Sequence, residues 1–548
     1  MPPNDADKVE QFTQVEINTN VIQTIGTDKE YDNSRVWTTK DNDTCTAKPI
    51  QYQTKIKSRT ANGKFQTPFH VVLFGYIFYL VVFAVSWARE LFYGTGPYRG
   101  INRKRFKEKF REEYVPLYSS FESFWARYGY RRLSNVFGNT IASVAGARIK
   151  VVKRVSDDDN WSFTLRPDSI KECINLASYN YLGYTENNGF CAEKAISGIK
   201  ENGISHCSRN QELGLSSIQR SLEKTVAKFL SVEDSITIGS GFATNALSIP
   251  CLVSKGCLVI SDEYNHASTI LGLRLSGATV KQFKHNDTES LENILRSSII
   301  KGQPRTNRPW KKILIVVEGI YSMEGSICPL KEIIEIKKRY NAYLYVDEAH
   351  SVGAMGPNGR GIVEYLSLDP SDVDLMMGTF SKNFGAAGGY IAGSKEMINF
   401  LRIHSHAKCY SSPMSPPVAN QIISSMECIM KKEMGGMERI QQLSKNATYF
   451  RKRLEQMGFV VVGDNMSPVI PIMMYNAAKF HAFVLECLKR GVATVGVGFP
   501  ATKLMEERVR FCISASHDKK MLDEALGVID IVGEFVNCKY NRKIQTVH

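Results

Sequence analysis

The sequence predicts an α/β fold with a mostly parallel sheet that is buried on both faces. Short apolar runs at 257–260, 313–317, 343–346 and 373–377 alternate with helical patterns such as 329–340. Runs of this kind, without a polar residue at every second position, are typical of strands that helices cover on both sides. Functional groups in such folds gather where the strands end.

The pattern changes after about residue 430, and the remainder predicts a smaller α+β domain. We expect helices and strands in alternation there, with helices at 438–457 and 477–490 and strands at 460–462, 469–474 and around 510–514. The two patterns together predict a large domain over 171–430 and a small C-terminal domain over 431–548.

The N-terminal part differs in composition from both domains. Residues 1–64 are polar and lack periodicity, so we expect a disordered tail. Residues 65–88 contain no Asp, Glu, Lys or Arg, which predicts a membrane-spanning or deeply inserted helix. A buried or in-plane helix is the alternative, because the strictly apolar part is short. Residues 89–170 are interpreted as a basic amphipathic linker and N-terminal arm.

The net charge of +14 is concentrated after the apolar segment, where six Lys or Arg residues fall within 103–111. A solvated helix face and a segment that contacts anionic lipid both explain such a cluster. We expect membrane lipid as a partner and no nucleic acid, since no recognised nucleic-acid-binding motif accompanies the cluster. The excess of basic residues after the apolar segment predicts that the following domain faces the cytosol.

Twelve cysteines are scattered along the chain, without a CxxC pair or a zinc-like spacing. Many lie within apolar runs, as Cys512 does between Phe511 and Ile513. This distribution indicates reduced, buried thiols in a reducing compartment. We therefore predict neither a metal site nor a disulfide framework.

Lys382 and Asp347 are the most informative pair of residues. Lys382 lies in a hydroxyl- and glycine-rich turn over 378–390, and Asp347 ends the apolar run before it. A lysine amine forms a Schiff base with pyridoxal phosphate, and a buried carboxylate keeps the pyridine nitrogen of that cofactor protonated. The pair therefore predicts a pyridoxal phosphate enzyme.

The other predicted strand ends supply groups for the same cofactor. Gly241 and Phe242 follow the run 235–238 and open a helix, whose free N–H groups suit a phosphate. Thr379 and Ser381 offer hydroxyls to that phosphate beside Lys382.

Three further strand ends offer groups for the ring and the substrate. His266 is placed to stack on a planar ring, and Ser322 to bond the substrate or the cofactor edge. His350 is placed to reach the ring oxygen or the substrate. Taken singly, each has a structural explanation, such as a hydrogen-bonded core histidine. Their common position at strand ends favours one site.

The stretch from about 175 to 517 resembles the α-oxoamine synthases, which are pyridoxal phosphate enzymes of fold type I. The motifs that resemble this family lie at 180–183, 261–268, 318–325, 347–353, 356–361 and 378–390. The resemblance implies condensation of an amino acid with an acyl-CoA and loss of carbon dioxide.

Residues 303–310, 404–406 and the apolar segment are similar to the membrane-bound branch of this family. That branch condenses L-serine with palmitoyl-CoA to 3-ketosphinganine, the first step of sphingolipid biosynthesis. The resemblance implies a catalytic subunit at the endoplasmic reticulum, in a heterodimer with a related first subunit that lacks the lysine, and small regulatory membrane proteins. A glycine-using synthase and a non-catalytic subunit of the same complex are the alternatives.

The resemblance also implies a role for each site residue. Lys382 would hold the cofactor covalently, His266 would stack on its ring, Asp347 would bind its nitrogen and His350 its oxygen. Ser412 matches a phosphate contact that homodimeric relatives contribute across the subunit interface. The candidates for the amino-acid carboxylate are Asn180, Ser322 and Arg510.

Two positions depart from the family pattern. Soluble relatives have an arginine just before a Pro-Pro pair, where this chain has Gly498-Phe499-Pro500. That arginine grips the substrate carboxylate, so the contact must come from elsewhere. Gln219 replaces a family histidine.

Overall fold

The computed structural model describes residues 69–93, 124–158, 160, 162–431 and 434–541. The predicted tail over 1–64, the start of the apolar segment and the basic cluster at 103–111 lie outside the described residues. The cysteines within the described ranges are free thiols.

A seven-stranded sheet forms the centre of the fold. Its strand order is β3 (Asp234–Ile238), β9 (Gly389–Gly393), β8 (Leu375–Thr379), β7 (Tyr343–Asp347), β6 (Ile313–Glu318), β4 (Leu258–Asp262) and β5 (Thr279–Phe283). Neighbouring strands from β8 to β5 are parallel, and β9 is antiparallel to both of its neighbours. The prediction of a mostly parallel α/β sheet is therefore confirmed.

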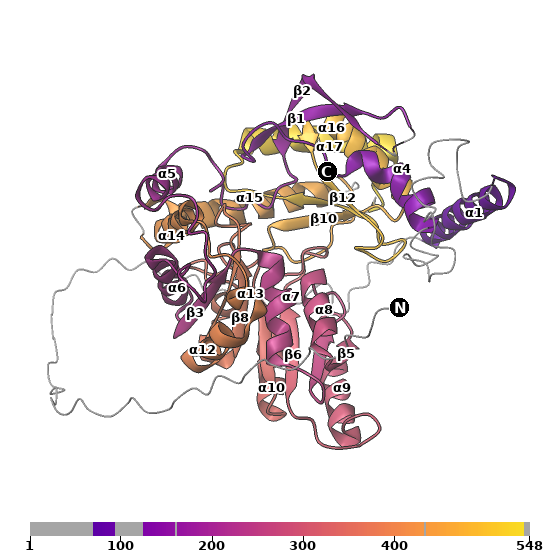
Figure 1. Ribbon diagram of the computed structural model, residues 1–548. Coiled ribbons are helices and arrows are strands. Elements are labelled where there is room, and N and C mark those ends of the chain that lie inside the picture. The colour runs from indigo at the N-terminus through magenta and orange to yellow at the C-terminus, as the bar shows by residue number, and fades with distance from the viewer. Residues whose placement is uncertain (1–68, 94–123, 159, 161, 432–433, 542–548) are drawn as a thin grey trace, which may run out of the picture. The chain divides into compact units, whose positions relative to one another are not determined.

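Both faces of this sheet are buried, because alternate residues of each strand enter different apolar clusters. In β6, Leu314 and Val316 join one cluster, whereas Ile315 and Val317 join the other. Figure 1 shows the helices alongside the strands. The first cluster includes side chains from α7 (Gly241–Leu252), α8 (Ala267–Ser276), α12 (Lys395–His404) and α13 (His406–Cys409). The second includes side chains from α9 (Thr288–Lys301), α10 (Leu330–Arg339) and α11 (Ile362–Tyr365).

The register of the central strands brings the predicted site residues to one edge. Glu318 at the end of β6 pairs with Asp347 at the end of β7, and Thr379 ends β8 opposite Gly389. His266 lies four residues after β4 ends and caps α8. The chemistry-bearing residues therefore lie at the carboxyl ends of the parallel strands.

The C-terminal part contains a separate small sheet and three longer helices. A three-stranded antiparallel sheet has the order β10 (Val469–Met473), β13 (Arg508–Cys512) and β12 (Val495–Val497). It is accompanied by α15 (Gly436–Gln456), α16 (Ala477–Lys489) and α17 (Lys519–Val536). The strand expected at 460–462 is reduced to an isolated bridge between Val461 and Ile472.

A third sheet was not expected from the sequence. β1 (Arg148–Val155) pairs with β2 (Thr164–Asn175), and β2 pairs with β11 (Val492–Ala493). Residues assigned to the linker over 89–170 therefore contain strands, and the boundary at 170 falls inside β2. The division into domains stays a prediction.

The remaining elements are mostly helical. α5 (Phe190–Asn202) and α6 (Ser217–Leu230) pack with α14 (Pro416–Met430). The short helical turns are η1 (Ala126–Tyr130), α4 (Arg131–Leu133), η2 (Ser134–Val136) and η3 (Pro370–Asp372).

The apolar segment is helical over α1 (Phe69–Tyr93). Its first 20 residues, Phe69–Ala88, have a mean hydropathy of 2.2, and they are long and apolar enough to cross a membrane. Large apolar side chains of this helix are exposed, among them Phe69, Leu80 and Trp87. The helix is consistent with the expected membrane anchor.

Candidate active site

Asp347 ends β7 and is held by two hydrogen bonds. Its Oδ2 accepts from Asn245 Nδ2 at 2.8 Å, and its Oδ1 accepts from the Ala349 backbone N–H at 2.9 Å. The side chain is buried, so both bonds are formed away from bulk water. The carboxylate is therefore fixed in orientation before any ligand arrives.

Asn245 also contacts Tyr345, on the same strand as Asp347, and Ser268 at the start of α8. Its Oδ1 accepts from the Tyr345 hydroxyl at 2.7 Å, and its Nδ2 also lies 3.1 Å from Ser268 Oγ. Asn245 was not among the site residues expected from the sequence. The available signal was a buried amide four residues after Gly241, one turn into the apolar helix α7.

Lys382 follows β8, and its Nζ lies 5.6 Å from the centre of the Tyr179 ring. Desolvation lowers the pKa of the Lys382 amine to about 8, although the Asp347 and Glu318 carboxylates act in the opposite direction. An amine with this pKa is neutral far more often at physiological pH than a solvated lysine. It can therefore act as a nucleophile and as a base.

His350 and Tyr181 form a second fixed pair. The Tyr181 hydroxyl lies 2.9 Å from His350 Nδ1, and the ring of Tyr179 packs edge-on against His350. Burial, followed by the positive charges of Lys382 and Arg510, holds the pKa of His350 well below its usual value. The imidazole is therefore neutral at pH 7.

His266 occupies the N-cap of α8. Its Nδ1 lies 2.7 Å from Ser268 Oγ and also accepts from the Ser268 backbone N–H, and its ring faces Phe242 at 6.2 Å. Desolvation lowers the pKa of His266. The ring is thus a neutral, flat surface of fixed orientation.

Glu318, the first residue of the 318–325 motif, is a buried acid without an expected role. It is buried beside Asp347 and accepts a hydrogen bond from the His266 backbone N–H. Desolvation and the nearby Asp347 raise the pKa of Glu318 well above its usual value. Glu318 therefore positions the backbone of His266.

The residues that were expected to bind a phosphate lie close together. α7 begins at Gly241, and a Cβ added there would lie 3.2 Å from Thr379 Cβ. Only glycine lets the start of this helix approach Thr379 so closely without a shift. The hydroxyls of Thr379 and Ser381 lie 2.7 Å apart. A helix N-terminus facing two hydroxyls is a suitable cradle for a phosphate.

Arg510 on β13 faces the same space. Its Nη1 donates to the Ser322 carbonyl at 3.3 Å, and its guanidinium lies 4.5 Å from the Tyr179 ring centre. Its Nε is buried without a hydrogen-bond partner among the described residues. A buried cationic donor without a partner is suited to a carboxylate ligand.

Asn180 is placed differently from the other candidates. Its Nδ2 donates to Thr185 Oγ1 at 2.6 Å and to the Ala145 carbonyl at 3.1 Å. The amide nitrogen is therefore committed to the local turn. A contact between Asn180 and a substrate carboxylate stays a prediction.

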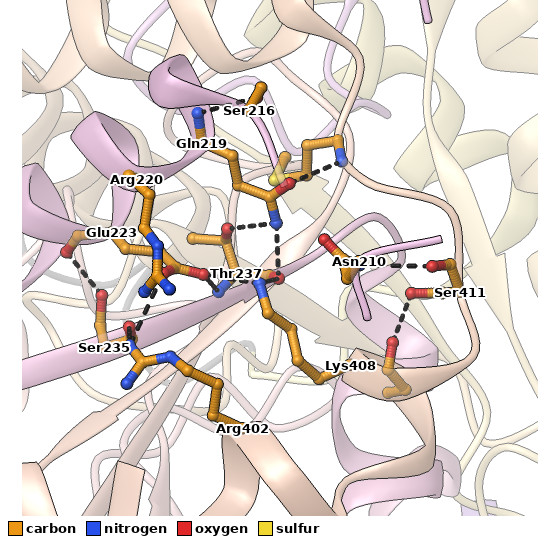
Figure 2. Close-up of polar contacts among 12 residues, drawn as sticks. Asn210, Ser216, Gln219, Arg220, Glu223, Ser235, Thr237, Arg402, Lys408 and Ser411 are labelled. Carbon is orange, nitrogen blue, oxygen red and sulfur yellow. Dashed lines mark hydrogen bonds and ion pairs between the residues drawn. The ribbon is translucent and has the colours of Figure 1, made fainter. Parts of the chain in front are cut away.

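Ser412 is exposed, in a segment that its neighbours hold in place. Gln219 Oε1 accepts from the Met414 backbone N–H at 3.3 Å, and Asn210 Nδ2 donates to the Ser411 carbonyl at 3.3 Å. Figure 2 shows the side chains of Gln219 and Lys408 both directed at Thr237. Gln219, which replaces the family histidine, therefore anchors the segment. The role of Ser412 toward a second subunit stays a prediction.

These groups define a class of protein, the pyridoxal phosphate enzymes of fold type I. The lysine, the fixed acid, the flat imidazole and the phosphate cradle all lie at one strand-end edge, and they fit the amine, ring and phosphate contacts of that cofactor. The described residues thus bring together groups that suit the amine, the ring and the phosphate of that cofactor.

Comparison with known proteins narrows the class. Residues 171–529 match the family described as aminotransferase class I and II. The chain is 50% identical over 470 residues to "Serine palmitoyltransferase 2" of Caenorhabditis elegans, which covers 85% of this chain and 84% of that protein. It is 46% identical over 482 residues to "Serine palmitoyltransferase 3" of Homo sapiens, covering 87% and 86%.

A solved structure agrees with these relatives. A lysine-to-alanine variant of serine palmitoyltransferase from S. paucimobilis, with a bound PLP–myriocin aldimine, matches with a TM-score of 0.66 and 25% identity. The match covers 77% of this chain and all of that one. The chain belongs to the aminotransferase class I and II family and, within it, to the serine palmitoyltransferases.

Proposed function

We propose that this protein is the catalytic subunit of a serine palmitoyltransferase. It joins L-serine to palmitoyl-CoA, with release of CoA and carbon dioxide, and forms 3-ketosphinganine for sphingolipid synthesis. The observation that supports this most strongly is the desolvated amine of Lys382 beside the fixed carboxylate of Asp347. A subunit without catalytic activity has no need of that pair.

Each residue of the site has a task in this reaction. When bound, pyridoxal phosphate supplies an aldehyde for the substrate amine and a ring that withdraws electrons from the α-carbon. Asp347 would hold the ring nitrogen and His266 would cover one face of the ring. His350 would hold the ring oxygen. Thr379 and the N–H groups at the start of α7 would bind the phosphate.

Substrate binding and proton transfer fall to Arg510, Ser322 and Lys382. Arg510 would bind the serine carboxylate through its free Nε, beside Ser322. This contact would replace the one lost with glycine at position 498. The Lys382 amine, with its pKa of about 8, would accept the α-proton.

The bonds of the overall reaction balance without an external oxidant. The α-carbon of serine forms a bond to the thioester carbonyl carbon, and the carbon–sulfur bond breaks, so that CoA leaves. The bond to the carboxylate carbon then breaks, carbon dioxide leaves, and the α-carbon receives a proton.

We also propose a partner subunit, related in fold and lacking the lysine. The segments that flank Ser412 expose apolar side chains that a partner could cover, namely Ile204, Leu213 and Tyr410. The segment that contains Ser412 is joined to the segment of Ile204 by a hydrogen bond from Ser415 Oγ to the Ile204 carbonyl at 2.6 Å. Such a patch on a fixed surface suits a protein partner.

The proposed location is the endoplasmic reticulum membrane, with the catalytic part in the cytosol. α1 supplies an apolar anchor, and the substrate acyl chain and the product both partition into lipid. Small regulatory membrane proteins would bind to this membrane-facing part.

The test is a matrix of substrates given to the complex purified from membranes. Serine and glycine are each supplied with short-chain and palmitoyl-CoA, and the ketone products are measured. Serine with palmitoyl-CoA should give the highest kcat/KM, and Lys382→Ala should abolish product formation while the complex still assembles. A preference for glycine would favour another α-oxoamine synthase. Full activity of Lys382→Ala would contradict the proposal.

A further inference from the structure

His285 lies outside the cofactor site but joins two of the loops that form it. It follows β5, and its Nδ1 lies 3.0 Å from Asp262 Oδ1 while its Nε2 lies 2.7 Å from Ser326 Oγ. Asp262 comes four residues before His266, and Ser326 comes four residues after Ser322. The imidazole therefore bridges the loop of the ring-stacking histidine and the loop of the substrate-facing serine.

Asp262, His285 and Ser326 are linked in the same order as the Asp, His and Ser of a hydrolytic triad. Their burial nevertheless excludes nucleophilic attack on a substrate by the serine. Ser326 is fully buried and Asp262 is 1% exposed, so no substrate carbonyl can reach the serine oxygen. A different role is required for three polar side chains that are joined so closely.

Both nitrogens of the His285 ring have a hydrogen-bond partner. Asp262 accepts from His285 Nδ1, as it does from the backbone N–H groups of Tyr264 at 2.9 Å and Asn286 at 3.0 Å. The second ring nitrogen, Nε2, shares a hydrogen bond with the Ser326 hydroxyl. His285 is thus a connector whose two ring nitrogens are both used in hydrogen bonds.

The ring is also fixed by aromatic packing. Tyr264 stacks on it with a centroid distance of 4.7 Å, and Tyr321 meets it edge-on at 4.4 Å. Tyr264 belongs to the His266 loop and Tyr321 directly precedes Ser322. The packing therefore connects the same two loops as the hydrogen bonds.

The Ser322 loop depends on this support at its far end. Backbone hydrogen bonds close it, from Tyr321 N to the Ser326 carbonyl at 3.0 Å and from Gly325 N to the Tyr321 carbonyl at 2.8 Å. Asn286, next to His285, donates to the Ile327 carbonyl at 3.0 Å. Movement of Ser326 would therefore move Ser322 and the carbonyl that Arg510 contacts.

We propose that His285 is a positioning residue for amino-acid binding: it holds the loops of His266 and Ser322 at a fixed separation without touching the substrate itself. The proposal rests on the proposed function. It predicts that loss of the His285–Ser326 bond weakens serine binding and leaves cofactor retention intact.

The experiment titrates L-serine into the cofactor-loaded complex without acyl-CoA and follows the visible absorbance of the cofactor. Ser326→Ala and His285→Asn should each raise the apparent Kd for serine about tenfold, because a positioning bond is lost. The double variant should be no worse than either single one, since both remove the same contact. His285→Gln keeps a hydrogen-bonding amide near the position of Nε2 and should recover most of the affinity.

His481→Asn is the control, because it removes a histidine on α16 that bonds Asn135, away from these loops. This variant should leave the affinity for serine unchanged, even where its melting temperature falls as much as those of the His285 and Ser326 variants. A Kd within about twofold of wild type in Ser326→Ala would overturn the inference, as would equal losses in His285→Gln and His285→Asn. If His285 variants fail to fold, Ser326→Ala alone decides. A wild-type complex without any response to serine would overturn the proposed function as well.

Discussion

Lys382 combines a buried amine with charges of both signs, and this combination sets its pH dependence. Its pKa is lowered from 10.5 to about 8, so the neutral amine becomes abundant as the pH rises through about 8. We predict that the rate at which cofactor-free enzyme reacts with pyridoxal phosphate rises with pH, with a midpoint near pH 8. Stopped-flow absorbance after mixing, at a series of pH values, measures it.

Two variants test the cause of that midpoint. Arg510 lowers the pKa of Lys382, so Arg510→Gln should move the midpoint upward. Asp347 raises it, so Asp347→Asn should move the midpoint downward. A midpoint near the ordinary value of 10.5, or shifts of the same sign, would show that the amine is not desolvated in this way.

Asn245 supplies the bond that fixes Asp347, and its loss should weaken cofactor binding. Asn245→Ala removes a hydrogen bond to a buried carboxylate, which costs about 1.5–3 kcal/mol, and so the Kd for pyridoxal phosphate should rise roughly tenfold to a hundredfold. Equilibrium titration of cofactor-free enzyme measures the change. Ser248→Ala, on the same helix and bonded to Ser405, is the matched control and should leave the Kd unchanged.

Residues of the site differ in how far the sequence could reveal them. Lys382, Asp347 and His266 follow apolar runs directly, so their position at strand ends was predictable. Asn245 and Tyr179 reach the site only through a helix start and a turn from distant parts of the chain. No local pattern encodes those approaches, because tertiary packing creates them.

Among the elements, α6 and α13 are joined by a buried ion pair. Lys408 Nζ lies 2.7 Å from Glu223 Oε1, and both side chains are almost fully buried (Figure 2). Arg402 also approaches Glu223, at 3.6 Å. The pair fixes the start of the segment that leads to Ser412.

Breaking this pair should destabilise the protein strongly. Glu223→Gln leaves the Lys408 ammonium buried without its counter-ion, and we expect a loss of about 3–5 kcal/mol. The double variant Glu223→Gln, Lys408→Met should recover much of that loss, because no buried charge remains. Thermal unfolding measures both. Lys431→Met removes an exposed pair with Glu427 and should cost less than about 1 kcal/mol. Equal effects of Glu223→Gln and Lys431→Met would contradict the prediction.

His517 accepts a bond from Asn446 on α15 through its carbonyl and reaches Asn175 at the end of β2, and it should make stability depend on pH. Its Nδ1 accepts from the Ser514 N–H at 3.1 Å, so its Nε2 donates to the Asn175 carbonyl. Desolvation lowers the pKa of His517 from 6.5 to about 4. Since the unfolded state takes up the proton first, stability falls as the pH drops below 6.5, by about 3 kcal/mol at pH 4.

Melting temperatures between pH 7 and pH 4 test this contribution. Wild type should lose stability over that range more steeply than His517→Gln, which has no proton to bind. Parallel slopes for the two proteins would rule out His517 as a source of the pH dependence.

The elements also show where sequence patterns are sufficient. The central strands were predictable because each is a short apolar run covered on both faces. β1 and β2 were missed, since β2 is exposed over most of its length and lacks an apolar run. β9 was missed because Gly389 and Gly393 bound it within a glycine-rich stretch that resembles a loop.

At the scale of the whole molecule, α1 differs from every helix of the catalytic part. Its exposed side includes Phe74, Leu80 and Val85, which would be costly in water. Its buried side contacts the catalytic part, where the Tyr79 hydroxyl bonds the carboxylate of Glu507. Arg508, the next residue, pairs with Glu324 at 2.9 Å beside the Ser322 loop. Glu507 and Arg508, which are neighbours in β13 and the turn before it, thus link α1 to the Ser322 loop.

We predict that α1 is the segment that holds this chain in the membrane. Full-length protein should remain in the membrane pellet after alkaline carbonate extraction, which removes proteins held only by other proteins. Deletion of 1–93 should release it into the supernatant, because the apolar length needed to span or insert is then gone. Deletion of 1–64 alone keeps α1 and should leave the protein in the pellet. Retention of the 1–93 deletion would place the anchor elsewhere in the chain, in the basic region that follows α1 or on the exposed apolar surface near Ser412.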